Sequence, residues 1–250
     1  MTTQLSSPHC QITVISLPRC GTSSIASIFQ DFGSINESDE KNAVCLYSQY
    51  ALNLAPLIDL NKYLVNRYRN DTPWIDCSSF NFLIIPELIS GFPDMKFIAL
   101  YRELSPWLNS FLKMLLYYFK LYDTQLPTWM TEYGRFYSSH FSPLRFLNIF
   151  NNIVGEAEIA MLTDFCQVWL DTNLQIRRSL PKDRTFYLDT KAISFSLPSI
   201  EIFFDLKSNS LSSSSHINKA RIVGDILPTL IFPVVKEVQN SFDLFVNESF

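Results

Sequence analysis

The residues from Pro18 to Ser24, Pro-Arg-Cys-Gly-Thr-Ser-Ser, carry the side chains of this chain that are best suited to holding an anion. They combine a guanidinium, a glycine and a run of hydroxyls. An apolar run over 12–17 precedes them, and apolar residues at helical spacing follow at Ile25, Ile28, Phe29 and Phe32. This order predicts a strand, a tight turn and a helix. Backbone N–H groups and the positive end of the helix dipole favour a phosphate or sulfate group at such a turn.

A nucleoside triphosphate loop is the first alternative for the turn at 18–24. Such a loop needs a Gly-Lys pair followed by Ser or Thr, because the lysine reaches the terminal phosphates and the hydroxyl binds magnesium. No Gly-Lys pair occurs anywhere in the chain. We therefore expect an anion site of another kind.

A second anion-binding pattern follows a second apolar run, Lys96–Tyr101, which is expected to form a buried strand. Arg102 comes directly after this run. The Ser105-Pro106 pair then predicts a helix start, with the serine as the cap and the proline in the first helical position. Ser110 lies eight residues after Arg102, in the early turns of that helix. A guanidinium at a strand end and a hydroxyl on the next helix can converge on one anion.

In combination, the two patterns resemble those of sulfotransferases that use 3′-phosphoadenosine 5′-phosphosulfate (PAPS). In that family a Pro-Arg/Lys-Ser-Gly-Thr-Ser/Thr loop after the first strand holds the 5′-phosphosulfate, and an Arg and a Ser at the spacing found here hold the 3′-phosphate. Position 20 departs from the loop, because a cysteine stands where the family has serine. The resemblance implies that the cofactor is bound by Arg19, Cys20, Gly21, Thr22, Ser23, Ser24, Arg102 and Ser110.

The resemblance extends to a late polar loop over 207–221, which is rich in hydroxyls and ends in two cations. In the family a late basic loop covers the 3′-phosphate, so Asn218, Lys219 and Arg221 are further expected cofactor contacts. The alternative is a serine-rich surface loop without such a role. The family's Glu/Asp-Lys-Ser-Pro segment is incomplete here, because Asp76 is followed by a cysteine and not by a lysine.

The mechanism that the resemblance implies is in-line transfer of the sulfuryl group to a hydroxyl or amine of an acceptor. Positioning and charge stabilisation are expected to dominate this reaction, as in phosphoryl transfer. Arg19 is expected to contact the bridging and sulfuryl oxygens. A general base must also reach the acceptor proton. The preferred candidate is Glu37, in the polar stretch after the first helix, and the alternatives are Asp39, Glu40, Asp76 and His140.

The composition fits one enzyme with a sizeable core, since 47% of its 250 residues are hydrophobic and 14% are aromatic. Strands that alternate with helices predict an α/β fold with a mainly parallel central sheet flanked by helices. The resemblance narrows this to the sulfotransferase type, which is similar to P-loop NTPases. We expect a single sulfotransferase domain over 1–250, in which the helical, aromatic-rich region of about 111–160 forms core and also lines an acceptor pocket.

The second half of the chain continues the alternation of helices and a strand. Apolar spacing predicts a helix over Met161–Ile176, a strand over Thr185–Asp189 and a helix over Leu197–Leu206. A last helix is expected over Ile226–Phe245, with an interruption at Pro233 because proline removes a backbone donor.

The remaining composition excludes several classes of protein. The net charge of −4 argues against a nucleic-acid partner. Five cysteines without a Cys-x-x-Cys pair and three histidines without ligand spacing predict neither a disulfide framework nor a metal site. The N-terminus lacks a signal-peptide pattern and no stretch of about 20 apolar residues occurs, so we expect a cytoplasmic protein without a membrane span. The sequence does not indicate an oligomeric state.

The expected function is sulfation of a small-molecule, natural-product-like acceptor in secondary metabolism. PAPS is the expected donor, 3′-phosphoadenosine 5′-phosphate (PAP) the product, and no metal is required. One alternative is a nucleotide-dependent kinase or other phosphoryl transferase, which the missing Gly-Lys pair disfavours. Another is a catalytically silent nucleotide-binding protein of the same fold, which the cysteines at positions 20 and 77 favour.

Substitution of Glu37 by alanine is expected to abolish turnover and to leave PAPS binding intact, because a general base acts on the acceptor and not on the cofactor. Sulfate transfer and calorimetric titration with the cofactor measure the two effects separately. Normal turnover in Glu37→Ala removes this residue as the base.

Overall fold

The structure, a computed structural model, describes residues 12–36, 40–51, 55–69, 75–122, 128–212 and 227–248. The chain divides into two compact units. The first, which we call the sheet unit, comprises Met1–Arg102 and Gln175–Asn218. The second, the helical unit, comprises Glu103–Leu174 and Lys219–Phe250. The expectation of a single sulfotransferase domain stays a prediction, and each unit is described by itself.

The sheet unit contains one parallel sheet. Within the described residues its five strands follow the order β2-β3-β1-β4-β5, and each neighbouring pair is parallel. The strands are β1 (Ile12–Ile15), β2 (Ser34–Ile35), β3 (Ile75–Asp76), β4 (Lys96–Tyr101) and β5 (Thr185–Asp189). The predicted α/β class, with a parallel sheet flanked by helices, is therefore confirmed.

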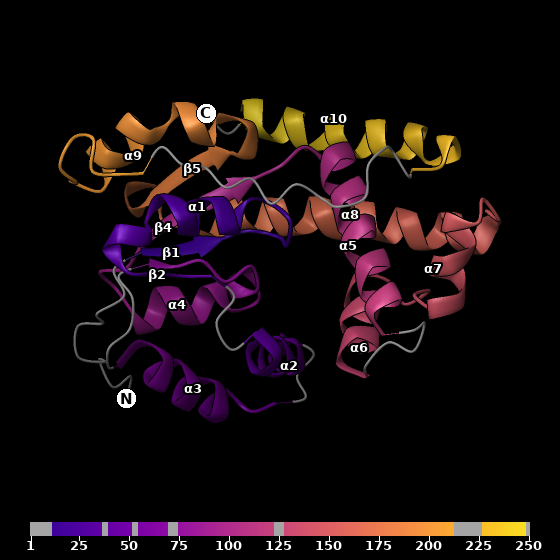
Figure 1. Cartoon of the computed structure of the whole chain (residues 1–250), viewed down its shortest axis with the longest axis horizontal. Coiled ribbons are helices and arrows are strands. Elements are labelled where there is room, and N and C mark those ends of the chain that lie inside the picture. The colour runs from indigo at the N-terminus through magenta and orange to yellow at the C-terminus, as the bar shows by residue number, and fades with distance from the viewer. Residues whose placement is uncertain are drawn as a thin grey trace. The chain divides into compact units, whose positions relative to one another are not determined.

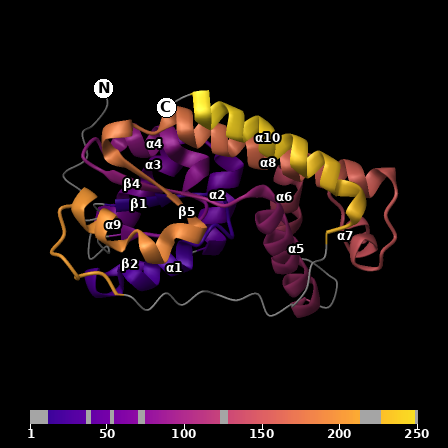
Figure 2. The ribbon, with the colours of Figure 1, turned by 90° about the horizontal axis from the view of Figure 1, so that it is seen from above.

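Helices cover both faces of this sheet. They are α1 (Thr22–Ile28), α2 (Glu40–Ala51), α3 (Leu57–Arg69), α4 (Ile85–Gly91) and α9 (Leu197–Phe203). Figures 1 and 2 show α1 on one face and α3 and α4 on the other. Right-handed crossovers explain this, because the connection from β1 to β2 and that from β3 to β4 run in opposite directions across the sheet. Strands covered on both faces become fully buried, as β1 is along its whole length.

The strand order also identifies the point at the carboxyl edge where the chain connections change direction. The neighbours β1 and β4 lead to connections that leave toward opposite edges of the sheet, β1 toward β2 and β4 toward β5. Ligands of open parallel sheets bind outside the carboxyl ends of strands at such a point. The loop after β1 contains Arg19, and Arg102 directly follows β4. Both motifs found in the sequence therefore lie at this edge.

The helical unit is built from α5 (Leu104–Leu121), α6 (Thr128–Tyr137), α7 (Pro143–Phe150), most of α8 (Glu156–Ser179) and α10 (Phe232–Glu248). Figures 1 and 2 both show α8 and α10 side by side. The rings of Trp169 on α8 and Phe242 on α10 are 5.3 Å apart between centroids. Burial of large rings between the two helices stabilises their packing.

The aromatic-rich region forms the core of the helical unit. The rings of Trp107 and Phe111 are stacked with centroids 5.2 Å apart, and Phe111 lies 4.7 Å from Tyr137. A second stacked pair, Phe119 and Phe146, has a centroid distance of 4.8 Å. Each of these rings is at most 1% exposed. The core part of the prediction is therefore confirmed, whereas the acceptor pocket stays a prediction.

The start of α5 differs from the sequence prediction. The helix begins at Leu104 with Glu103 as its N-cap residue, so Ser105 and Pro106 lie inside the first turn. The reason is a tertiary bond: the backbone N–H of Leu104 donates to Oε1 of Gln239 on α10 at 2.9 Å. A partner on another helix thus satisfies the N–H of the first residue of α5, and the helix begins one residue before the predicted serine cap.

Two boundaries near the C-terminus were also predicted wrongly. Pro233 does not interrupt a helix, because it is the second residue of α10. The first turn of a helix has no intrahelical acceptors for its N–H groups, so a proline costs little there. Helix α9 ends at Phe203 and not at Leu206, and Asp205 two residues later has a φ of 56°, in the left-handed region. The strand Thr185–Asp189 was predicted correctly.

Gly134 on α6 is expected to be intolerant of a side chain, because a β-carbon there would overlap the buried ring of Phe141. Alanine gains up to about 1 kcal/mol of helix propensity over glycine. Overpacking costs about 1–3 kcal/mol, so Gly134→Ala should lower the free energy of unfolding by up to about 2 kcal/mol. Urea unfolding measures this. Stability equal to that of the wild-type protein would contradict the expectation.

Candidate anion-binding site

The loop after β1 reverses the chain within a few residues by using left-handed backbone conformations. Arg19 has a φ of 69° and Gly21 a φ of 102°. Gly21 adopts its conformation without strain, while Arg19 does so at a cost because it carries a β-carbon. The turn ends at α1, whose first turn is closed by bonds from the N–H groups of Ser24 and Ile25 to the carbonyl of Gly21, at 3.0 and 3.1 Å.

Gly21 is also required by close packing. A β-carbon at this position would lie 3.1 Å from Cδ1 of Ile193 and 3.3 Å from Cγ2 of Thr190. Both residues belong to η4, the 3-10 helix Thr190–Phe195 that follows β5. Glycine at position 21 therefore lets the loop rest directly on the segment after the last strand.

A hydrogen bond joins the two sequence motifs. Nη1 of Arg102 donates to the carbonyl oxygen of Arg19 at 2.8 Å. The two strands bring them together, since β1 and β4 pair in parallel with Ile15 opposite Ala99. Burial lowers the pKa of Arg102, because desolvation penalises its cation. A guanidinium remains charged despite such a shift, so a half-buried cation stands beside the loop.

Ser23 and its neighbours on α1 were predicted to donate to an anion. Ser23 is half-buried, and Nδ2 of Asn36 donates to its hydroxyl oxygen at 3.0 Å. Because the oxygen accepts from Asn36, the hydroxyl proton of Ser23 is directed elsewhere. The flanking residues Thr22 and Ser24 are buried. Sequence reasoning missed Asn36, which directly follows β2, a strand too short to show a periodic pattern.

Cys20 is buried, with 1% of its surface exposed. Burial raises the pKa of its thiol to about 12, although Arg102 and Arg19 act in the opposite direction. The thiol is therefore protonated at neutral pH and is not a reactive nucleophile. The group through which residue 20 can serve an anion is its backbone N–H.

Thr190 connects the loop and the end of β4, and sequence reasoning missed it. Its hydroxyl oxygen lies 2.7 Å from the carbonyl oxygen of Cys20 and 2.7 Å from that of Tyr101. The residue directly follows the predicted strand Thr185–Asp189. Its position at the carboxyl end of a strand, beside the other two loops, was the available signal.

The start of the predicted late loop is described up to Ser212. The carboxylate of Glu201 accepts hydrogen bonds from the backbone N–H groups of Ser210 at 2.7 Å, Leu211 at 2.9 Å and Asn209 at 3.0 Å. These bonds hold the pKa of Glu201 below its ordinary value, and the bond from Leu211 has the largest effect. The N–H of Ser212 donates to the carbonyl of Ile28, the last residue of α1, at 3.2 Å. The chain thus enters the late loop beside α1.

Other predicted site residues are not tested by the structure. Glu37, Asp39, Asn218, Lys219 and Arg221 lie outside the described residues. Glu40 is the first residue of α2, and its side chain is not described. Ser110 is a buried residue of α5 in the helical unit, so its pairing with Arg102 stays a prediction.

Asp76, one alternative for the general base, is instead bound by neighbouring residues within the core of the fold. It is fully buried, and Nε and Nη2 of Arg67 donate to its two oxygens at 2.9 Å each. The hydroxyl of Tyr68 at 2.7 Å and the N–H of Ser78 at 3.0 Å add further bonds. Burial alone would raise the pKa of Asp76, but Arg67 outweighs it and the pKa is lowered. A carboxylate with so low a proton affinity is a poor base.

His140, another alternative, belongs to a polar group in the helical unit. Its Nδ1 lies 2.9 Å from Oδ2 of Asp164, and the same oxygen accepts the hydroxyl of Ser138 at 2.6 Å. The side chain of His140 is 48% exposed. The aspartate holds the ring in one orientation, which leaves Nε2 available to a ligand or to water.

Two further properties bear on the site. Among the described residues no group of three or more His, Cys, Asp or Glu side chains is arranged to hold a metal ion. Nor is any described helix long and apolar enough to cross a membrane.

Comparison with known families identifies the class of protein. A model of the sulfotransferase domain matches residues 66–193, just over half of the chain, so the chain belongs to the sulfotransferase domain family. The matched part contains Arg102, Ser110 and Thr190, and the loop at 18–24 lies outside it. A comparison with curated proteins found no match.

Three solved structures are similar to the chain over most of its length. A sulfotransferase from Alicyclobacillus acidocaldarius is 10% identical, with 94% of this chain and 91% of that chain covered and a TM-score of 0.48. The sulfotransferase domain of the Synechococcus PCC 7002 olefin synthase is 12% identical, with 97% and 98% covered and a TM-score of 0.42. A sulfotransferase domain from the curacin biosynthetic pathway is 12% identical, with 81% and 76% covered and a TM-score of 0.36. Likeness at this level says nothing about substrate or partner.

The buried pair of Asp76 and Arg67 is expected to make stability depend on acid. Asp76→Asn leaves a buried guanidinium without its counter-charge and should cost about 3–5 kcal/mol of unfolding free energy at neutral pH. Because the pKa of Asp76 in the folded protein lies below the unfolded value of about 4, wild-type stability should fall as the pH drops through and below about 4. The Asn variant should lack this contribution.

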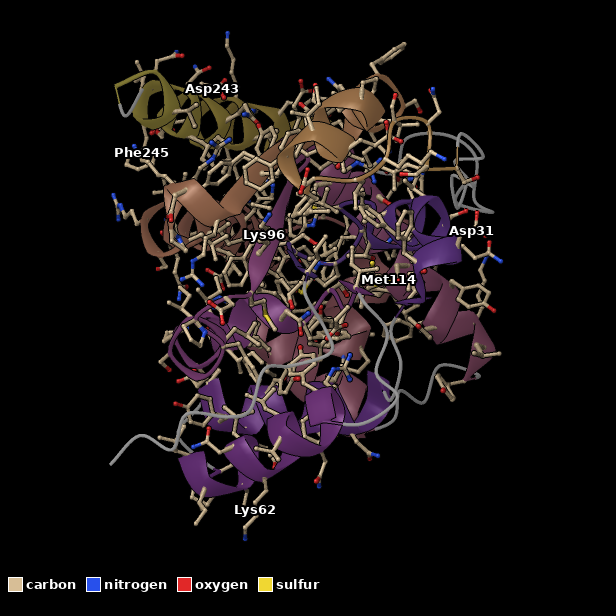
Figure 3. All side chains as sticks on the ribbon, turned by 90° about the vertical axis from the view of Figure 1, so that its left-hand side faces the viewer. Asp31, Lys62, Lys96, Met114, Asp243 and Phe245 are labelled. Atoms are coloured by element: carbon tan, nitrogen blue, oxygen red, sulfur yellow. The ribbon has the colours of Figure 1, made fainter. Side chains whose placement is uncertain are left out.

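Urea unfolding at neutral and acid pH measures both effects. Asp59→Asn is the matched control, because Asp59 is 53% exposed and lies 4.0 Å from Lys62, whose side chain projects from α3 into solvent (Figure 3). Such surface pairs contribute about 0–1 kcal/mol. Equal losses in the two variants would contradict a special role for the buried pair.

Proposed function

We propose that the protein binds PAPS at the carboxyl edge of its sheet and transfers the sulfuryl group to a hydroxyl or amine of a small-molecule acceptor. The hydrogen bond from Arg102 to the carbonyl of Arg19 carries the proposal. It joins the residues that match the family's 5′-phosphosulfate loop to the arginine that matches its 3′-phosphate motif. Membership of the sulfotransferase domain family supports the same reading.

The 5′ end of the cofactor is assigned to the loop after β1. Arg19 contacts the bridging and sulfuryl oxygens, and Gly21 lets the backbone approach the phosphate closely. Thr22, Ser23 and Ser24 supply N–H and hydroxyl donors, while Cys20 contributes its N–H. The bond from Asn36 to the oxygen of Ser23 supports this role, because it directs the hydroxyl proton of Ser23 away from Asn36.

The 3′-phosphate is assigned to Arg102 and Ser110, with Asn218, Lys219 and Arg221 of the late loop as further contacts. The attachment of Ser212 to the end of α1 supports the late-loop assignment, because the loop then begins beside the helix that carries the 5′ site. The half-buried guanidinium of Arg102 suits a phosphate, since charge-assisted bonds gain strength away from water.

The reaction is an in-line displacement at sulfur. An oxygen or nitrogen of the acceptor forms a bond to the sulfuryl sulfur as the bond from sulfur to the phosphate oxygen breaks, and the electron pair leaves on PAP. The acceptor proton passes to a base, for which we propose Glu37. The residue before it in the chain, Asn36, bonds to Ser23 of the loop at 18–24, which we call the anion loop, and this supports the choice. Arg19 stabilises the charge that develops on the leaving oxygen.

The acceptor is proposed to be a small, natural-product-like molecule of secondary metabolism that contacts the aromatic-rich region at about 111–160. No resident metal is assigned, and a cytoplasmic location belongs to the same proposal. The net charge of −4 supports an acceptor other than nucleic acid. The two alternatives, a phosphoryl transferase and a silent nucleotide-binding protein, are separated by the experiment that follows.

Calorimetry with PAP and with ATP, each with and without a chelator, tests the proposal. PAP should bind without magnesium and ATP should bind far more weakly. Ser110→Ala should weaken PAP binding by about tenfold, as one hydrogen bond to a charged group is lost. The affinity for adenosine 5′-phosphosulfate, which has no 3′-phosphate, should not change. Ser105→Ala, on the first turn of the same helix, is the matched control.

The outcomes separate the three functions. Preference for ATP together with dependence on magnesium contradicts the proposal and supports a phosphoryl transferase. Tight binding of PAP without transfer from PAPS to any of a panel of phenols, alcohols and amines supports a silent binding protein. Transfer that continues in the presence of the chelator supports the sulfotransferase.

A further inference from the structure

We propose that Thr190 is a positioning residue of the nucleotide site, whose hydroxyl orients the backbone donors of the anion loop. The inference rests on the proposed function, since it concerns how tightly PAP is held there. It concerns residues of the sheet unit alone.

The hydroxyl of Thr190 lies between two carbonyl groups that flank the site. Its oxygen is 2.7 Å from the carbonyl of Cys20, in the anion loop, and 2.7 Å from that of Tyr101, the last residue of β4. A hydroxyl has a single proton, so it donates to one carbonyl at a time. The loop after β1 and the strand end before Arg102 therefore share one donor.

Bonds to carbonyl groups also determine where backbone N–H groups point. In a trans peptide the C=O of one residue and the N–H of the next point in opposite directions. Arg102 binds the carbonyl of Arg19 and thereby orients the N–H of Cys20. Thr190 binds the carbonyl of Cys20 and thereby orients the N–H of Gly21. Two successive donors of the anion loop are thus directed by side chains from two other strand ends.

Thr190 is itself held in place by the sheet. Asp189, the residue before it, pairs with Tyr101 in the register of β4 and β5. The carboxylate of Asp189 accepts the N–H of Lys191 at 2.7 Å, which fixes the first turn of η4. The methyl group of Thr190 lies 3.3 Å from the place where a β-carbon on Gly21 would stand. The sheet register therefore sets the position of the hydroxyl against the loop.

Thr190→Val removes the hydroxyl and keeps the shape of the side chain, while Thr190→Ser keeps the hydroxyl. Thr185→Val is the matched control, because Thr185 also donates to a carbonyl, that of Pro181 at 2.7 Å, but at the amino end of the same strand. We measure the affinity for PAP by calorimetry, the unfolding midpoint in urea, and hydrogen exchange of the amides of Cys20, Gly21 and Thr22 in the ligand-free protein.

Thr190→Val should bind PAP about tenfold more weakly, because an unpaired buried carbonyl and a misdirected donor replace one hydrogen bond. Its loop amides should exchange faster. Thr190→Ser should restore both properties to near the wild-type values. Thr185→Val should lower the unfolding midpoint without changing PAP affinity or loop exchange, which separates positioning from general stability.

Unchanged PAP affinity in Thr190→Val overturns the inference, and so does an equal loss of affinity in Thr185→Val. If the wild-type protein binds no PAP, the proposed function fails and the exchange measurement alone decides. Faster exchange of the loop amides in Thr190→Val, with rescue by Thr190→Ser, then still supports the ordering role, and unchanged exchange overturns it.

Discussion

The contact between the guanidinium of Arg102 and the backbone carbonyl of Arg19 is the constraint on which the candidate site depends. It requires two neighbouring parallel strands in one register, because only then do their carboxyl ends meet. It also requires a turn whose carbonyl at Arg19 faces Arg102. Arg19 and Gly21 adopt left-handed conformations in this turn. Arg102 therefore holds the loop in place and also brings its positive charge beside the position proposed for an anionic ligand.

The support of the loop is spread over elements far apart in the chain. Thr190 stands 170 residues after Cys20, and Arg102 stands 83 residues after Arg19, yet both bond to consecutive carbonyls of the same turn. These contacts need β1, β4 and β5 to be paired, so the conformation of the anion loop depends on the sheet as well as on the loop's own sequence. Asp76 and Arg67 belong to the same unit and join β3 to α3 through a buried ion pair.

Local patterns in the sequence were sufficient for the strands and the motifs. The strand before Arg102 was predicted correctly, because a strand covered on both faces reads as a continuous apolar run. Strand Thr185–Asp189 was also predicted correctly, from its short apolar centre, although it lies at the edge of the sheet and is only partly buried. The start of α5 was missed, since its first N–H is satisfied by Gln239, 135 residues away. Thr190 and Asn36 were missed for the same reason, because their partners lie on other elements. The partners of Thr190 are in the loop after β1 and on β4, and the partner of Asn36 is on α1. The structural role of Asp76 became clear only from the structure, which shows both of its oxygens bound by Arg67 of α3.

The buried thiol of Cys20 in the anion loop resists oxidation and alkylation. The thiolate is the form that attacks peroxides and alkylating reagents, and a pKa raised to about 12 leaves almost none of that form at neutral pH. Cys20 therefore adds no oxidation-sensitive position at the turn. Cys45 on α2 is less deeply buried, which makes it the better place for a covalent label that leaves the loop untouched.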